Sequence, residues 1–487
     1  MDALLLASMT AVVAVVFSRR AASLTRPRDD DGSAAFSSSH AKELAHAHGL
    51  GHSCRPYFYV DFSATHLNHG SYGTAPREVV AAATREMIAI EAWPDAFMRR
   101  HALTLVSDAA DAAGAMFFRA PKGTCAFVEN ATAGVNAVLR SAAVPRGSAI
   151  MIFNHTYNAC KNAVYNVAEL AGLDVITVDI PLPLARGADG TITSALVAQL
   201  CAALDAERGR VSLVLIDHMT SPTAIVMPVR ELAAAARARG ARVLIDGAHS
   251  PAQLADLDVP ALGGDWYVGN LHKWAFTLKG VALLWAGDDV RDTTQGAIIS
   301  HFWKRDFQAR FFMQGTLDYS RYLSVPAAVA FVNNRLGGFD AVRAYNMALA
   351  EAGARTLAEA WSAASAQHGG APRPTPIRML EPGVERAPFL AVVRTPLNWR
   401  AWVRDENGND VRSLDDASAR ATLAADGGLP ERIANAVLKV AGVQSVFYAW
   451  EYAGEPAIWC RISAQVYNVI EDFCVVAGGV LEVLKLE

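Results

Sequence analysis

A lysine and an aspartate in the middle of the chain carry the clearest chemical signal. Lys273 follows the stretch 265–272, which is rich in aromatic and apolar residues, and Asp246 ends the apolar run 243–245 three residues before His249. A lysine amine forms a Schiff base with an aldehyde, a carboxylate holds a pyridine nitrogen in its protonated form, and polar groups bind ring substituents. Pyridoxal phosphate chemistry needs this combination, so the set predicts an enzyme that uses this cofactor.

Each of these residues also has an ordinary structural interpretation when it is considered alone. An aspartate at the end of a strand is most often a helix cap, and a His-Lys pair such as His272-Lys273 is usually a surface feature. When the residues are considered together, these structural interpretations become less favoured, because several strand ends of one predicted sheet carry the polar groups that the chemistry requires.

The elements around these residues alternate between short apolar runs and alanine-rich stretches. Strands are expected over 125–128, 149–153, 175–178, 211–216 and 242–245. A helix is expected over 229–239, between the last two of these strands. Such alternation predicts an α/β fold with a mostly parallel sheet covered by helices on both faces. Ligands of these sheets lie at the carboxyl ends of the strands.

Three strand ends have side chains that suit a phosphorylated ring. Small residues at 129–136 open a helix after the first strand, which indicates either a phosphate seat or an ordinary helix cap. Tyr157 follows the second strand, where it stacks on a planar ring or packs within its loop. The stretch 217–222 follows the fourth strand, and it either donates to a ring oxygen or forms a turn.

Composition excludes several other classes of protein. A chain of 487 residues predicts two or three domains, and 52% hydrophobic with 19% charged residues indicates a globular protein with a large core. The net charge of -4 and the lack of basic runs argue against a nucleic-acid partner. Six cysteines are scattered without metal-ligand spacing, so neither a metal site nor a dense disulfide framework is predicted.

The N-terminal region carries an apolar run at 4–17 that is followed by Arg19 and Arg20. The run is shorter than the roughly 20 residues of a membrane span, and Asp2 stands where a secretory signal carries positive charge. A targeting or anchoring segment and an unstructured extension both stay open, and membrane contact is expected only through this segment. We otherwise expect a cytoplasmic protein.

Three regions are expected along the chain. Residues 1–55 form an N-terminal extension that includes a linker over about 32–52, residues 56–325 form a large cofactor-binding domain, and residues 326–487 form a small C-terminal domain.

The sequence resembles the class V aminotransferase family of pyridoxal-phosphate enzymes over roughly Tyr57 to Ile470. The stretches 67–73, 217–221 and 461–468 are similar to the branch of isopenicillin N epimerase-like proteins, hercynylcysteine sulfoxide lyases of ergothioneine synthesis and plant-type cysteine desulfhydrases. The resemblance implies fold type I. This fold has a mostly parallel seven-stranded sheet sandwiched by helices and a smaller C-terminal α+β domain.

The resemblance also implies roles for residues around the cofactor. Lys273 would form the Schiff base and later move the α-proton, and Asp246 would pair with the pyridinium nitrogen. The other implied contacts are His249, Thr220 and Ser221 near the ring oxygen, Tyr157 stacked on the ring with His155 as a second choice, and Ala131, Thr132, Asn270 and His272 at the phosphate.

Substrate and partner contacts are implied in the same way. Arg461 would hold the carboxylate of a small amino-acid substrate, while Asn68 and Tyr72 would line the entrance. Gly315 and Thr316 resemble the segment with which a second subunit reaches the phosphate, so the resemblance implies a homodimer with shared active sites.

One departure from the family bears on the reaction. Cysteine desulfurases carry a nucleophilic cysteine on a late mobile loop, but this chain has no cysteine between Cys201 and Cys460. Cys160 and Cys460 are expected to be packed in the interior. The sequence therefore favours a carbon–sulfur lyase that acts by β-elimination on cysteine or a cysteine conjugate such as a sulfoxide, giving pyruvate, ammonia and a thiol product. An aminotransferase, an epimerase, a desulfurase and a non-catalytic cofactor-binding protein stay open as alternatives.

Overall fold

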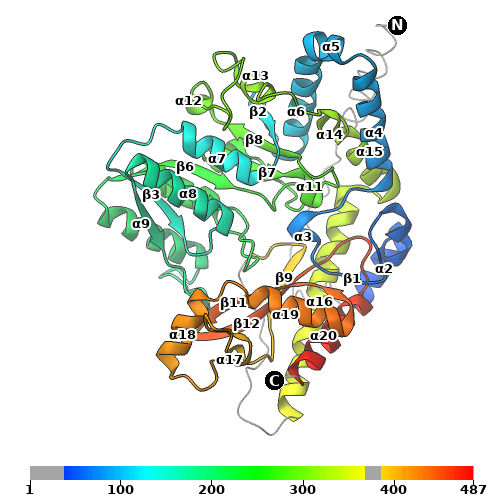
Figure 1. Ribbon diagram of the computed structural model, residues 1–487, viewed down its shortest axis with the longest axis vertical. Helices are drawn as coiled ribbons and strands as arrows, with labels where there is room; N and C mark the ends of the chain where they lie inside the picture. The colour runs from blue at the N-terminus through cyan, green and yellow to red at the C-terminus, as the bar shows by residue number, and fades with distance from the viewer. Residues whose placement is uncertain (1–37, 368–384, 410, 486–487) are drawn as a thin grey trace.

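A seven-stranded sheet forms the centre of the larger part of the molecule (Figure 1). The computed structural model describes residues 38–367, 385–409 and 411–485. The strands of the sheet are β2 (Cys125–Val128), β3 (Ala149–Phe153), β4 (Asp174–Val178), β5 (Val211–Asp217), β6 (Arg242–Asp246), β7 (Trp266–Asn270) and β8 (Ala282–Ala286). Their order is β2-β8-β7-β6-β5-β3-β4, and only the pairs that involve β8 are antiparallel. The five strands predicted from apolar runs all form, and the mostly parallel α/β sheet of a fold type I enzyme is confirmed.

Helices cover both faces of this sheet, which explains why its strands read as continuous apolar runs. In β5, Leu213 and Leu215 belong to the core under α7 and α8, whereas Val214 and Ile216 belong to the core on the opposite face. The covering helices are α6 (Ala102–Phe118), α7 (Ala131–Ser141), α8 (Asn158–Ala171), α9 (Ile192–Ala206) and α10 (Val229–Arg237). Side chains of α6, α9 and α10 line the opposite face.

A smaller antiparallel sheet forms the lower part of the molecule in Figure 1. Its strands are β9 (Leu390–Arg394), β11 (Val446–Tyr452) and β12 (Glu455–Ser463), with β12 in the middle. The helices packed around it are α16 (Phe339–Gln367), α19 (Leu429–Ala441) and α20 (Ile470–Leu484). The arrangement is the α+β type expected for the C-terminal part, while the boundaries at 55 and 325 stay predictions.

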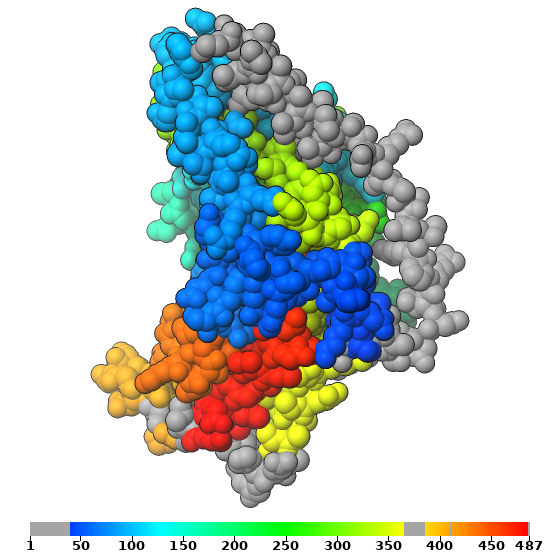
Figure 2. Space-filling model, turned by 90° about the vertical axis from the view of Figure 1, so that its right-hand side faces the viewer, coloured from blue at the N-terminus to red at the C-terminus, as the bar shows by residue number. Residues whose placement is uncertain are grey.

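The segment that precedes residue 56 is more structured than the sequence suggested. Helix α2 (Ser38–His48) packs against α16, and Ala41 and Leu50 are buried. Figure 2 shows this dark blue segment against the yellow and red segments that contain α16 and α20. The predicted linker over 32–52 is therefore wrong from Ser38 onward, because a short apolar face was hidden among serine and histidine residues.

The apolar run at 4–17 lies outside the described residues. Among the helices that the structure describes, none combines the length and the apolar character that a membrane crossing demands.

Two single-turn helices meet where the two sheets approach each other. Helix α11 (Leu271–Trp274) follows β7, and helix α3 (His69–Tyr72) follows β1 (Thr65–His66), which pairs with β10 (Val443–Gln444). Figure 1 shows α3 below α11 and above the small sheet, and α3 contacts α11 directly. These two helices position the lysine and connect it to the strand that carries Arg461.

Candidate active site

Lys273 lies on α11, directly beyond the carboxyl end of β7. Its amine is 3.0 Å from Nε2 of His249, and its side chain is buried. Burial, with a further contribution from the positive charge of Arg461, lowers the pKa of Lys273 to about 8. Desolvation opposes the charged form of an amine, so about one tenth of this lysine is a neutral nucleophile at pH 7, far more than for a free lysine.

Asp246 ends β6 and accepts two hydrogen bonds in a buried position. The backbone N–H of Ala248 donates to Oδ1 at 2.9 Å, and the thiol of Cys160 on α8 donates to Oδ2 at 3.2 Å. Burial raises the pKa of Asp246, and among the described residues no positively charged group forms an ion pair with its carboxylate. A pyridinium N–H would supply that positive charge and would stabilise the ionised form.

A second aspartate, Asp217, lies beside Asp246, because the two residues are in register at the ends of β5 and β6. Oδ1 of Asp217 accepts a hydrogen bond from the backbone N–H of Tyr157 at 3.1 Å, whereas Oδ2 is buried without a partner in the described chain. Burial and then the charge of Asp246 raise the pKa of Asp217 well above its usual value. Sequence reasoning placed Asp217 in a stretch that either donates to a ring oxygen or forms a turn, and assigned the aspartate no role of its own. The signal that would have found it is the occurrence of two aspartates at the ends of neighbouring strands.

The orphaned polar atoms of the site test whether the predicted cofactor fits. Nδ1 of His249, Oδ2 of Asp217 and Nε of Arg461 are buried without a hydrogen-bond partner in the described residues. Native proteins rarely leave such atoms unpaired, so they indicate a polar ligand. Burial lowers the pKa of His249 well below its usual value, which leaves a neutral ring beside Lys273. A ring with a nitrogen, a hydroxyl group and a phosphate offers matching partners, so pyridoxal phosphate fits.

The expected phosphate seat is the start of α7. Asn130 caps this helix by accepting the N–H of Ala133, and the N–H of Ala131 donates to Oδ1 of Asn270 at 2.8 Å. Thr132 lies in the first turn beside Ala131. His272 is adjacent to Lys273 and donates from Nδ1 to the carbonyl of Val281, and burial lowers the pKa of its ring to about 4. The structure thus brings Ala131 and Asn270 into contact, while the phosphate roles stay predictions.

Tyr157 and His155 differ in how freely their rings can meet a ligand. Tyr157 precedes α8, and 44% of it is exposed. His155 is buried, its Nε2 donates to the carbonyl of Ile180, and its Nδ1 accepts from the hydroxyl of Thr223. Both nitrogens of His155 are therefore occupied by the fold. This arrangement favours Tyr157 as the stacking residue, as the resemblance implied.

Ser221 and Thr220 turn out to have different partners. The carbonyl and hydroxyl oxygens of Ser221 both accept from the guanidinium of Arg461. The hydroxyl of Thr220 bonds Thr223 and accepts the N–H of Ile225 within its own loop. Ser221 therefore connects the end of β5 to the arginine, whereas the side chain of Thr220 stabilises the turn.

Arg461 on β12 is a buried cation surrounded by neutral acceptors. Nη1 donates to Ser221, and Nη2 donates to Oδ1 of Asn68 at 3.1 Å and to Oγ of Ser71 at 2.8 Å. Its side chain is only 1% exposed, and in the part of the chain that the structure describes no carboxylate pairs with it. A buried charge without a counter-ion is costly, so the site is built to receive an anion. Tyr72 on the same turn is exposed.

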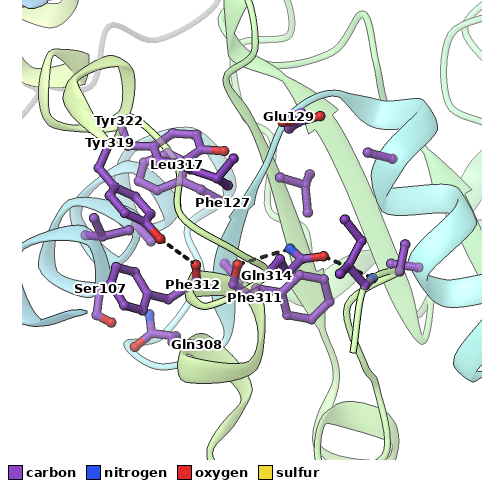
Figure 3. A pocket seen from close by; sticks show the side chains of 18 residues that line it. Ser107, Phe127, Glu129, Gln308, Phe311, Phe312, Gln314, Leu317, Tyr319 and Tyr322 are labelled. Carbon is purple, nitrogen blue, oxygen red and sulfur yellow. Dashed lines mark hydrogen bonds between the residues drawn. The ribbon is translucent and has the colours of Figure 1, made fainter. Parts of the chain in front are cut away.

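A separate cavity of about 280 Å³ lies beside β2, and none of the residues around Lys273 lines it. Figure 3 shows Phe127, Tyr319 and Tyr322 on one side of it, and the rings of Phe127 and Tyr322 are stacked with centroids 4.6 Å apart. Gly315 and Thr316 are exposed on the segment that links α13 (Phe307–Phe312) to α14 (Ser320–Leu323). The predicted contact of Thr316 with a cofactor thus depends on a second subunit.

Comparison with known proteins identifies the class to which this fold and site belong. Residues 71–373 match the family described as aminotransferase class-V, so the protein belongs to that family. Its cofactor is pyridoxal 5'-phosphate.

The chain is also similar to individual proteins of known type. A candidate L-cysteine desulfhydrase of Oryza sativa subsp. japonica is 34% identical over 61% of this chain and 62% of its own length. Isopenicillin N epimerase of Streptomyces clavuligerus is 28% identical over 62% of this chain and 76% of its own length. The chain thus spans less than two thirds of the rice relative. The cystine C–S lyase C-DES, solved with glycine covalently linked to its cofactor, shares the fold with a TM-score of 0.62 at 18% identity, over 88% of this chain and 98% of that chain.

Proposed function

We propose that the protein is a pyridoxal-phosphate-dependent carbon–sulfur lyase. Its substrate is cysteine or a cysteine conjugate, including a sulfoxide of the kind cleaved in ergothioneine synthesis. The reaction consumes one water and gives pyruvate, ammonia and a sulfur product, which is hydrogen sulfide from cysteine, a thiol from a thioether and a sulfenic acid from a sulfoxide. The observation that supports this proposal is the placement of the six cysteines, of which only Cys160 contacts the site, as a buried thiol that donates to Asp246.

Transfer of sulfur to the protein needs a reactive thiolate. Cys160 is the cysteine in contact with the site, but its thiol donates to Asp246, and burial together with that carboxylate raises its pKa well above the usual value. Cys460 precedes Arg461 on β12 and packs on the opposite face of that strand, in the core of the small sheet. The remaining four lie outside the residues that surround Lys273. Elimination to a free thiol product needs no protein thiol, so it fits this arrangement better.

The proposed roles of the side chains follow from their partners. Arg461 holds the α-carboxylate, because a guanidinium grips a carboxylate through two parallel hydrogen bonds and its charge is otherwise unpaired. Asp246 would keep the proton on the pyridine nitrogen of the cofactor, and Cys160 and Ala248 hold its carboxylate in place. Tyr157 would cover the ring, and the start of α7 with Asn270 and His272 would hold the phosphate.

Lys273 is the proton carrier of the proposed reaction. Pyridoxal phosphate, when bound, withdraws electrons from the α-carbon and so weakens its C–H bond. The neutral amine of Lys273 takes the α-proton, the Cβ–S bond breaks, and sulfur leaves with the electron pair. His249 lies within hydrogen-bond distance of this amine and orients it. Water then completes the conversion of the remaining three-carbon unit into pyruvate and ammonia.

Names of related proteins agree with this chemistry. The rice relative and the cystine lyase C-DES are both named for carbon–sulfur cleavage. The similarity to isopenicillin N epimerase favours a second candidate, in which Lys273 returns the proton to the opposite face of the α-carbon and no bond to sulfur breaks. The two candidates share the arginine and the lysine and differ in the fate of the β-substituent.

The proposed assembly is a homodimer with shared active sites in the cytoplasm. Exposed apolar side chains gather at Ile298, Ile299 and Trp303, next to the cavity of Figure 3 and close in sequence to Thr316. Two-fold dimers are the commonest oligomers, and a second copy would cover this apolar segment. Light scattering of the cofactor-loaded protein tests the proposal, because a monomer that keeps all its cofactor would contradict it.

Turnover of a panel of cysteine derivatives tests the reaction. The purified protein should release pyruvate and ammonia in equal amounts, together with hydrogen sulfide from L-cysteine, a thiol from an S-alkyl cysteine or a sulfenic acid from a cysteine sulfoxide. Exchange of the α-proton with deuterated water but no pyruvate would support the epimerase instead. Amino-group transfer to a keto acid without pyruvate release would indicate an aminotransferase, and either result would overturn the lyase.

A further inference from the structure

The hydrogen bonds of Arg461 restrict how it can bind a substrate. A guanidinium has four terminal N–H groups and one Nε–H, and a carboxylate binds either across the two terminal nitrogens or across Nε and one of them. All four terminal hydrogens have acceptors, which are the two oxygens of Ser221 and the side chains of Asn68 and Ser71. Nε–H is buried and has no acceptor in the described chain. The open position is therefore the side edge that contains Nε.

Ser71 has a defined direction of hydrogen bonding. Its hydroxyl donates to Oδ1 of Asn68 at 2.6 Å, so its oxygen is left to accept the N–H of Arg461 at 2.8 Å. Asn68 Oδ1 accepts from both the serine and the arginine. The three hydrogen bonds between Asn68, Ser71 and Arg461 form a closed triangle in which each hydrogen lies between a donor and an acceptor. Such a triangle fixes the plane of the guanidinium more firmly than one contact would.

The same turn also holds the backbone of the reactive lysine. Nε2 of His69 donates to the carbonyl of Lys273 at 2.5 Å, and Nδ1 therefore accepts from the hydroxyl of Tyr467 at 2.9 Å. A Cβ on Gly73 would lie 1.8 Å from the carbonyl oxygen of His272, so the turn and α11 approach backbone to backbone. The turn that contains Asn68, His69 and Ser71 thus contacts both Arg461 and Lys273.

We infer that Ser71, together with Asn68, is a positioning residue that turns the Nε edge of Arg461 toward the substrate carboxylate. The inference rests on the proposed function, in which Arg461 binds that carboxylate. The carboxylate takes Nε–H and shares one hydrogen of Nη2 with the turn. Because His69 anchors the same turn to Lys273, the distance between the carboxylate and the amine is fixed by one segment of four residues.

The inference predicts a loss that is selective for ligands with a carboxylate. L-alanine and ethylamine differ only in that group, and the binding of each to the holoenzyme is measured by the change in cofactor absorbance. The Ser71→Ala variant should weaken L-alanine binding about 10-fold, as expected for one hydrogen bond to a charged group, with ethylamine binding unchanged. Ser71→Thr keeps the hydroxyl and should restore L-alanine binding. Ser148→Ala removes a serine hydroxyl that bonds only its own turn and should change neither ligand.

The outcomes separate this inference from the proposed function. If Arg461→Ala abolishes the preference for L-alanine but Ser71→Ala and Asn68→Ala leave it intact, the positioning role is wrong and the arginine role stands. If Ser71→Ala weakens both ligands equally, the serine supports the fold only, and the inference fails. If Arg461→Ala keeps the full preference for L-alanine, both the inference and the proposed carboxylate site are wrong.

Discussion

Replacement of Cys160 separates the two ways in which a thiol near the cofactor can act. If Cys160 only supports Asp246, the Cys160→Ala variant should keep most of its kcat when the cofactor is saturating. Its cofactor affinity should fall, because one of two chain donors to the buried carboxylate is lost. An S–H group is a weak donor and its distance to Oδ2 is 3.2 Å, so we expect a loss of about 1 kcal/mol, or about fivefold in Kd.

The assay is a titration of cofactor-free protein with pyridoxal phosphate, followed by pyruvate release at saturation. Cys160→Ser replaces the thiol donor with a hydroxyl donor and should bind the cofactor at least as well as the Ala variant. Cys460→Ala, which removes a cysteine from the opposite face of β12, serves as the control for loss of a buried thiol. Abolished turnover in Cys160→Ala with full cofactor content would refute the reasoning and would make the thiol a sulfur acceptor.

Three further predictions follow from the residues around the lysine. Borohydride should fix the cofactor on Lys273, and a Lys273→Ala variant that still holds reducible cofactor on another lysine would contradict the assignment. The Gly73→Ala variant should lose cofactor, because the added Cβ would meet a backbone carbonyl. Gly442 has the same φ of +64° but nothing within 4 Å of an added Cβ, so Gly442→Ala serves as the control. It should cost only about 1–2 kcal/mol of unfolding free energy, measured by urea titration. In the cofactor-free protein between pH 8 and 10.5, the amine of Lys273 is protonated in the unfolded chain but not in the folded chain. The unfolding free energy should therefore rise by about 3 kcal/mol over this pH range, relative to the Lys273→Met variant. Equal pH profiles of the two proteins would contradict the lowered pKa.

Local sequence patterns predicted five of the seven strands of the large sheet and the polar residues that follow them. Fully buried parallel strands such as β3 and β5 are short apolar runs between polar segments, so their limits can be predicted without an alignment. Asp246 and Tyr157 were then found from the rule that ligands lie beyond the carboxyl ends of parallel strands. The prediction of Asp246 and Tyr157 required only the local sequence around each strand.

Contacts between distant segments could not be predicted in this way. Ser71 and Arg461 are separated by 390 positions, and Cys160 and Asp246 by 86, so nothing in either local pattern links them. The predicted role of Thr316 involves a second chain, and contacts between two chains are not visible in the pattern of one. Helix α2 was missed for a different reason, since its apolar face is narrow and its other residues are typical of linkers.

Desolvation is one physical cause that gives the lysine and the cysteine opposite reactivities. Burial disfavours the charged form of every group, so it favours loss of the proton from Lys273 and retention of the proton on Cys160. The same environment thus favours a nucleophilic amine on Lys273 and an unreactive thiol in contact with Asp246. Among the described residues, neither Arg461 nor Asp246 forms an ion pair, and the proposed partners of these charges are the carboxylate of an amino acid and the ring nitrogen of the cofactor. A site of this kind suits a reaction in which sulfur departs as a small product and never bonds to the protein.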